Sequence, residues 1–208
     1  EFTYTSIACS SSPRVPVTGT VNPLPVATAT PASQTVCSGP ITSIILTSSE
    51  PGTTYAWTRD NTVNVTGIAA SGTGDISGTL TNNTFVPQTV TFTITPTVTA
   101  TGCVGAPITA TVTVNAVPTI TCPANITVNN TLGLCGNTVT YTPTFTGIPV
   151  PTITYAFTGA TTASGSGDGS GSFFNVGTTT VTITATNSCG FDDCTFTVTV
   201  IDAEPPVV

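Results

Sequence analysis

The stretch Thr89-Val90-Thr91-Phe92-Thr93-Ile94-Thr95-Pro96-Thr97 alternates Thr with a larger apolar residue or proline at every step. Successive side chains of a β-strand point to opposite faces, so the apolar residues share one face and the threonines share the other. Thr is also β-branched, which favours an extended backbone. The stretch therefore predicts a strand with one buried face and one hydrated face.

Similar alternating runs occur along the whole chain, and no segment shows a sustained helical period. Gly and Pro interrupt these runs at short intervals, as they do between strands. We therefore expect an all-β protein with almost no helix. The expected strands are Ser43–Ser48, Thr53–Thr58, Ile76–Thr81, Thr89–Thr97, Ile108–Asn115, Ile126–Val128, Thr138–Thr144, Thr152–Thr158, Phe173–Phe174, Thr179–Thr186 and Cys194–Ile201.

One short motif recurs: an expected strand is followed by Asn or Asp and then by Pro. It occurs at Asn22, Asn115 and Asp202. Pro cannot continue a central strand, so these positions mark domain joints. The interval of about 90 residues is close to the size of an immunoglobulin-type β-sandwich. We expect an elongated tandem array: the C-terminal strands of an upstream repeat in residues 1–25, sandwiches in residues 26–117 and 118–203, and a linker to a next repeat in residues 204–208.

Charged residues make up only 5% of the 208 residues, with 2 Lys+Arg, 9 Asp+Glu and no His. Without His, no Ser-His-Asp triad, imidazole metal site or His general base can form. The net charge of -7 offers no basic surface to nucleic acid, and the apolar runs are too short to enter a membrane. We therefore expect no enzyme, catalytic residue, cofactor, nucleic-acid partner or membrane insertion.

The seven cysteines of this acidic, lysine-free chain favour disulfides and an oxidising, extracellular location. Trp57 lies between Cys37 and Cys103, a spacing similar to that of the immunoglobulin core. We expect a Cys37–Cys103 bond that staples strand ends. Cys9 is expected to pair with a cysteine upstream of Glu1, or to remain a free or intermolecular thiol. Because the chain begins without Met or a signal peptide, we interpret it as a fragment or a processed product.

The last four cysteines allow three connectivities. In an immunoglobulin-type sandwich the first and last strands can run side by side in parallel, which favours Cys122–Cys194 and leaves Cys135–Cys189. The alternative is a Cys189–Cys194 hairpin bond together with Cys122–Cys135.

Few other residues are candidates for binding. Hard cations require several carboxylate oxygens, so calcium at a domain joint is a weak hypothesis for Asp192, Asp193, Asp202 and Glu204, and we commit to no metal site. The run Ser164–Gly171 lacks the Lys and the following helix of a phosphate loop and is expected to be a flexible loop. The aromatic residues follow strand patterns typical of core positions.

The third repeat carries four motifs that together resemble the HYR (hyalin repeat) domain. This resemblance implies an immunoglobulin-like fold and a bacterial setting in giant surface adhesins of Bacteroidota. The repeat lacks the Asp-Asn-Cys motif common near the middle of bacterial HYR repeats and has Cys189 in addition. The motifs are Thr121–Val128 (TCPANITV), Cys135-Gly136, Phe174–Thr186 (FNVGTTTVTITAT) and Asp193–Val200 (DCTFTVTV).

The middle repeat resembles the PKD-like domains of the same kind of protein, and the first 25 residues resemble the tail of a similar repeat. Together these resemblances imply a slice of a long array such as the SprB-type gliding adhesins, exported by the type IX secretion system. The matching segments are Ser33–Gly39 (SQTVCSG), Gly52–Thr58 (GTTYAWT), Ala69–Gly74 (AASGTG), Ile76–Leu80 (ISGTL) and Pro87–Pro96 (PQTVTFTITP).

The expected function is structural and adhesive, without catalysis: a segment of a cell-surface filament stiffened by disulfides and proline joints. Its expected partners are neighbouring repeats or subunits of the same type, and polysaccharide or abiotic surfaces. Two alternatives remain open. The chain is a subunit of a filament joined by exchanged β-strands, with Phe2–Ser6 and Pro16–Asn22 as donors, or it is an accessory region of a secreted carbohydrate-active enzyme.

Overall fold

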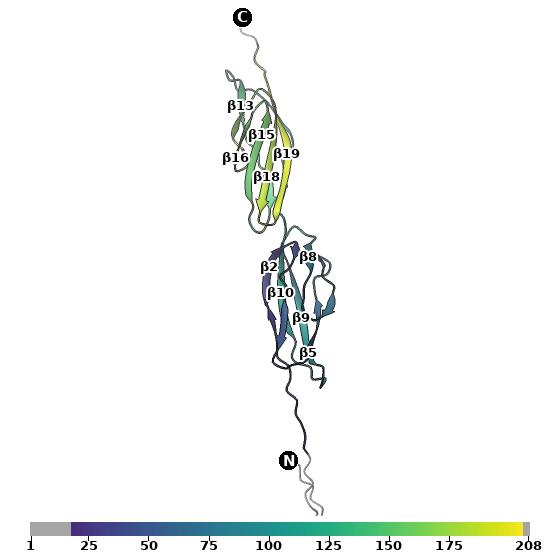
Figure 1. The fold of residues 1–208 in the computed structure, drawn as a ribbon. Helices are drawn as coiled ribbons and strands as arrows, with labels where there is room; N and C mark the ends of the chain where they lie inside the picture. Colours follow the sequence, from purple (N-terminus) through teal and green to yellow (C-terminus); the bar gives the residue numbers. More distant parts are fainter. Residues whose placement is uncertain (1–17, 206–208) are drawn as a thin grey trace, which may run out of the picture.

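The computed structural model describes residues 18–205, which form two β-sandwiches placed end to end (Figure 1). Every regular element between residues 18 and 205 is a β-strand. The prediction of an all-β fold is therefore confirmed. Residues 1–17, which include Cys9 and most of the expected upstream strands, and residues 206–208 of the expected linker lie outside the described residues.

The first sandwich pairs a five-stranded sheet, in the order β2-β10-β9-β5-β7, with a layer made of β1-β4 and β3-β8-β6. Within the five-stranded sheet, β2 runs parallel to β10, and the other neighbours are antiparallel. The strands are β1 (Ala27–Thr30), β2 (Ser33–Cys37), β3 (Gly39–Pro40), β4 (Ile45–Ser48), β5 (Thr53–Arg59), β6 (Val65–Gly67), β7 (Ser71–Thr73), β8 (Thr79–Asn82), β9 (Gln88–Val98) and β10 (Ile108–Asn115).

The second sandwich repeats this plan with the sheet order β12-β19-β18-β15-β16, faced by the pairs β11-β14 and β13-β17. Again the only parallel neighbours in the described sheet are its first two strands, β12 and β19. The strands are β11 (Thr119–Thr121), β12 (Ile126–Asn129), β13 (Gly136–Val139), β14 (Thr144–Thr146), β15 (Thr152–Gly159), β16 (Ala163–Ser166), β17 (Ser172–Asn175), β18 (Gly177–Asn187) and β19 (Gly190–Ile201).

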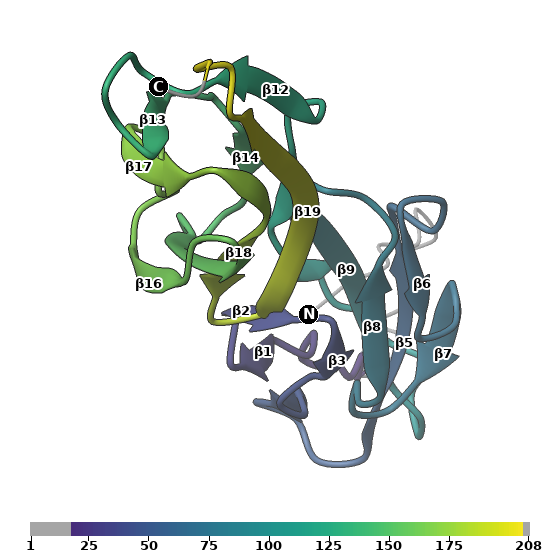
Figure 2. The same cartoon turned by 90° about the horizontal axis from the view of Figure 1, so that it is seen from above.

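Each sandwich encloses its own apolar core, and the two cores share no residue. Val90, Phe92 and Ile94 of β9 are fully buried, while the threonines between them are exposed or half-buried. The same period of two recurs in β18, where Val181 and Ile183 are buried. Figure 1 accordingly shows two separate bodies with one chain segment crossing between them, and in Figure 2 the view from above makes the two sandwiches overlap.

Trp57, the only tryptophan of the chain, belongs to the first core. Its ring meets Phe92 edge to face at a centroid distance of 5.7 Å, and its indole N–H donates to the carbonyl of Gly74 at 3.1 Å. Gly72 lies directly opposite Trp57 on β7. The ring covers this glycine, so a Cβ on Gly72 would come within 2.2 Å of Cζ2.

Arg59, the one cation among residues 18–205, is buried and makes hydrogen bonds to backbone carbonyls. Its guanidinium donates to Ile68 at 2.7 Å and to Val65 at 3.1 Å. Burial lowers the pKa of Arg59, and nearby Asp60 partly opposes that shift. This side chain therefore anchors the loop after β5 and adds no positive surface.

Three expectations about local structure need correction. The expected strand Thr138–Thr144 is two strands, β13 and β14, because Pro143 lies between them and cannot donate to a ladder. The run Ser164–Gly171 is not wholly a loop, since its start belongs to β16, and Tyr141 O–H donates to Asp168 O at 2.9 Å. Residues 18–22 of the expected upstream strand form no strand here.

Replacing Gly72 with Ala should destabilise the first sandwich by about 1–3 kcal/mol, because the new methyl group forces the packed Trp57 ring to move. Urea unfolding followed by Trp57 fluorescence measures this change in the first domain alone. The exposed neighbour Ser71 supplies a control, since Ser71→Ala removes an oxygen atom and adds no atom that could clash with the ring. Equal stability of the two variants would contradict this account of the packing.

Candidate functional site

Most carboxylates within residues 18–205 accept hydrogen bonds from backbone amides instead of converging on a cleft. Asp60 accepts from the Thr91 N–H at 2.6 Å, and Asp75 accepts from the Leu46 N–H at 2.8 Å. Asp168 closes a turn in the same way. These groups satisfy backbone donors at strand edges and turns, a structural task.

The four acidic calcium candidates form two separate pairs at the two ends of β19. Asp192 accepts from the Ile120 N–H at 2.9 Å, with Asp193 beside it. At the other end Asp202 accepts from the amide of Glu204 at 3.1 Å. At ~3.3 Å per residue the pairs are about 30 Å apart. Within the described residues, no group of three or more His, Cys, Asp or Glu is placed to hold a metal ion.

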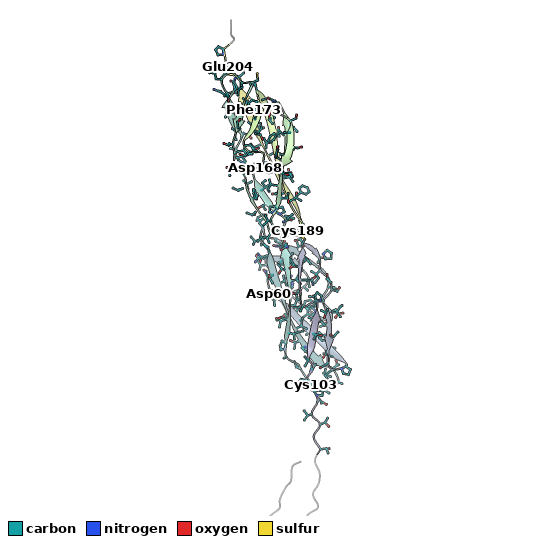
Figure 3. All side chains as sticks on the ribbon, turned by 90° about the vertical axis from the view of Figure 1, so that its left-hand side faces the viewer. Asp60, Cys103, Asp168, Phe173, Cys189 and Glu204 are labelled. Carbon is teal, nitrogen blue, oxygen red and sulfur yellow. A yellow bond between two sulfur atoms is a disulfide. The ribbon has the colours of Figure 1, made fainter. Side chains whose placement is uncertain are left out.

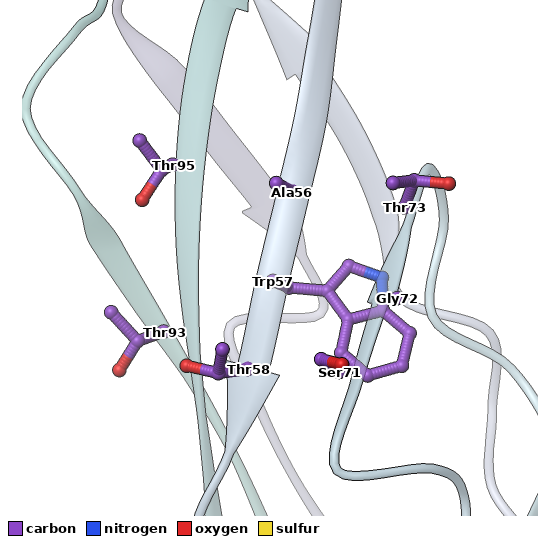
Figure 4. Close-up of a pocket in the computed structure, with 8 residues that line it drawn as sticks. All are labelled: Ala56, Trp57, Thr58, Ser71, Gly72, Thr73, Thr93 and Thr95. Carbon is purple, nitrogen blue, oxygen red and sulfur yellow. The ribbon is translucent and has the colours of Figure 1, made fainter.

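A shallow depression on the first sandwich lies beside Trp57 and Gly72 (Figure 4). Its other lining residues are small or hydroxylated, and none of them is titratable. Tyr55 borders a neighbouring hollow, and its pKa is raised by burial and by the negative charge of Asp75. A neutral phenol and Thr hydroxyls offer hydrogen bonds without acid–base chemistry. The remaining lining residues are Ala56, Thr58, Ser71, Thr73, Thr93 and Thr95.

The most distinctive feature is a disulfide that crosses the joint between the sandwiches. Cys37, at the end of β2, is bonded to Cys189, in the tight turn between β18 and β19, with a Cα–Cα distance of 5.2 Å. Figure 3 shows Cys189 at the level where the two sandwiches meet. The bond joins residues separated by 152 positions in the sequence.

The joint is reinforced by a short connection and a shared turn. Only Ala116, Val117 and Pro118 separate β10 from β11. The Asn187 side-chain amide donates to the Ala116 carbonyl at 3.3 Å, across the same junction as the disulfide. A Cβ on Gly190 would lie 3.0 Å from Val117 Cγ1, so the turn packs directly on the connection. The connection and the disulfide together give two covalent links between the domains.

The second disulfide joins Cys122 to Cys194 within the second sandwich, at a Cα–Cα distance of 5.6 Å. This is the pairing that the sequence favoured, and the parallel register of β12 and β19 explains it, because Ile126 lies opposite Val198. The two cysteines precede these partners by equal steps. The alternative hairpin connectivity, Cys189–Cys194 with Cys122–Cys135, is wrong.

Two expected bonds, Cys37–Cys103 and Cys135–Cys189, are also wrong, because each would join opposite ends of one sandwich. Cys37 lies opposite Asn115 at the end of β10, whereas Cys103 precedes the start of β10. At ~3.3 Å per residue that strand alone separates them by about 23 Å, far beyond disulfide reach. Cys103 and Cys135 form no disulfide within residues 18–205.

The disulfide between the two domains was not predicted, because cysteines were paired only within one repeat. The sequence signal for this bond is the position of each cysteine at the end of its domain. Cys37 ends a strand just before the Gly39-Pro40 break, and Cys189 occupies a two-residue turn, so both lie at domain ends. The burial of Arg59 was also not predicted, although Arg59 lies on the same inward-facing side of β5 as Tyr55 and Trp57.

Comparisons with known proteins give one family match and two structural likenesses. Residues 34–118 match the family model of the PKD-like domain. The two-domain structure of DIP-gamma IG1+IG2 is similar over 86% of this chain and 98% of that chain, at a TM-score of 0.50 and 12% identity. Mouse cadherin-23 EC22–24 covers 86% of this chain and 65% of its own, at a TM-score of 0.48 and 15% identity. No curated protein sequence matches the chain.

The chain thus has the fold of a tandem of immunoglobulin-like sandwiches, and residues 34–118 match the PKD-like family model. Immunoglobulin-like domains with disulfides are typical of extracellular or secreted proteins. Between residues 18 and 205 there is no helix that is long and apolar enough to cross a membrane.

Replacing Cys189 with Ser should loosen the joint while both sandwiches stay folded, because their cores share no residue. Small-angle X-ray scattering should then show a broader range of interdomain angles. Cys103→Ser serves as the matched control, since that thiol forms no bond within the described residues. Indistinguishable scattering from the two variants would show that the disulfide does not restrain the joint.

Replacing both Cys122 and Cys194 with Ser should destabilise the second sandwich by roughly 4 kcal/mol, through the loss of a cross-link between distant residues. The first sandwich should keep its stability, which Trp57 fluorescence reports separately. Calorimetry of the double variant should show one transition lowered and one retained. A parallel fall of both transitions would contradict the independence of the domains.

Proposed function

We propose that the chain is a structural segment of an extracellular adhesive array, in which immunoglobulin-like repeats form an extended tether without catalysis. The observation that carries the proposal is the Cys37–Cys189 disulfide, which locks two consecutive sandwiches end to end. The finer assignment follows the sequence resemblance: residues 118–203 as a HYR-like repeat, and the whole as part of a giant Bacteroidota surface adhesin of the SprB type, exported by type IX secretion and used in gliding.

The disulfide also decides how such a tether carries tension. A pull on the two ends of the chain passes along the backbone to Cys37, through the sulfur atoms to Cys189, and out along β19. The backbone between these cysteines is a closed loop that takes no part in the shortest covalent path. Most of both sandwiches is therefore shielded from forced extension, as a stalk that holds an adhesive region away from a cell requires.

The outer faces suit a tether that stays hydrated without charge. Cross-strand Thr pairs occupy the solvent side of both large sheets, and some of them are hydrogen-bonded to each other, such as Thr89 with Thr113 and Thr178 with Thr199. Such surfaces present hydroxyl groups to polysaccharide or abiotic surfaces, which we propose as the adhesion targets.

Stretching single molecules by their two ends tests the proposal. In reductant the loop with a sequence separation of 152 is released, so unfolding should gain about 500 Å more contour length than in the oxidised chain, at ~3.4 Å per residue. The Cys189→Ser variant should gain an intermediate amount, because the Cys122–Cys194 bond still closes a shorter loop. Equal gains with and without reductant would refute the tether mechanism.

One observation favours a second candidate, a filament joined by exchanged strands. Residues 18–24 form no strand, and Val21 and Leu24 are exposed. An extended segment of this kind can add to the sheet edge of another molecule. Removing residues 1–22 should then abolish assembly of purified chains that are kept reduced. If the chain is a simple tandem tether, the truncation should not change its state of assembly.

A further inference from the structure

Cys103 and Cys135 lie at opposite ends of the two-domain body. Cys103 is in the turn between β9 and β10, at the free end of the first sandwich (Figure 3). Cys135 immediately precedes β13 and lines a depression with Asp202 and Glu204 at the free end of the second sandwich. Cys135 is exposed and Cys103 is partly exposed, so both thiols are accessible at surfaces where an array would continue.

Cys135 lies in the same connection of the second sandwich, toward the same end of the domain, as Cys37 does in the first. Cys37 precedes β3, whose Gly39 pairs with β8, and Cys135 precedes β13, whose Gly136 pairs with β17. Cys37 ends the strand that runs parallel to the last strand, and Cys135 follows the corresponding strand by six residues, so both lie toward the end where the chain leaves the domain. The free end of the second sandwich therefore has a cysteine that can play the part that Cys37 plays in the existing junction.

Cys103 occupies the place in the first sandwich that Cys189 occupies in the second. Both lie in the turn between the last two strands. Each turn also packs against the segment that enters its domain. A Cβ on Gly105 would come within 2.0 Å of the Pro25 carbonyl oxygen, as a Cβ on Gly190 would meet Val117. The free end of the first sandwich therefore has a cysteine that can play the part that Cys189 plays in the existing junction.

Exposed apolar residues lie next to both cysteines in the sequence. Leu132 and Leu134, just before Cys135, are 88% and 50% exposed, and Val104, beside Cys103, is 54% exposed. Their burial against a facing domain end would add to the covalent link, since removing apolar surface from water is favourable. The two ends match in chemistry as well as in topology.

We propose that Cys135 of one copy and Cys103 of a second copy form a disulfide, so that the copies join head to tail in repetition of the Cys37–Cys189 junction. Both S–H bonds break and one S–S bond forms. The two electrons and two protons pass to a small-molecule disulfide, which is reduced to two thiols. This inference rests on the proposed role as a segment of an extended array, and it identifies the partner as another unit of the same type.

Controlled oxidation of the purified chain tests the proposal, with Cys9→Ser in every sample so that Cys103 and Cys135 are the thiols compared. With oxidised glutathione, this parent protein should form a ladder of covalent oligomers that collapses to monomer in reductant. Neither Cys103→Ser nor Cys135→Ser alone should oligomerise. An equimolar mixture of the two variants should give one dimer, in which mass spectrometry finds Cys103 linked to Cys135.

Absence of the ladder would overturn the proposal, and so would symmetric Cys103–Cys103 or Cys135–Cys135 dimers of the single variants. Trp57 fluorescence checks that each variant keeps its fold. The single-molecule extension of one copy depends on Cys37 and Cys189 instead, so it still tests the tether when end-to-end coupling fails.

Discussion

The structure depends above all on the two-residue period of its strands, which sends one side chain into a core and the next into water. With almost no charged residues to hydrate the surface, Thr takes the outward positions on strand after strand. A shift of register by one residue would exchange the two faces and bury a row of hydroxyls. The core alternation therefore fixes which residues meet at the ends of each sandwich, including the cysteines of the joint.

The parallel pairing of β2 with β10, and of β12 with β19, determines which residues lie at the end of each domain. Because these strands run side by side, the cysteine that ends β2 lies next to the point where the chain leaves the domain. The following domain presents its last turn at the same point. The interdomain bond thus follows from the ordinary topology of the fold, with cysteines placed at two corners.

Sequence alone predicted the strands that are long and regularly alternating, such as β10 with its exact bounds Ile108–Asn115. It missed several short strands, including β1, β2, β6 and β11. Among the others missed, β7 and β16 have no alternating pattern because of their Gly and Ser, and they form only by pairing with β5 and β15. The pairing of Cys122 with Cys194 could be inferred from strand topology. The pairing of Cys37 with Cys189 was not inferred, because it depends on how two domains meet, and the positions of the two cysteines at domain ends do not by themselves identify the partner.

The long loop closed by Cys37 and Cys189 also changes what a protease can do to this protein. Cleavage of any single peptide bond between these residues leaves the two ends of the chain joined through sulfur. Exposed turns are the usual sites of nicking, and most turns of both sandwiches lie inside the loop. A nicked molecule therefore remains one covalent piece, and an array built from such units is not severed by an isolated cut within the loop.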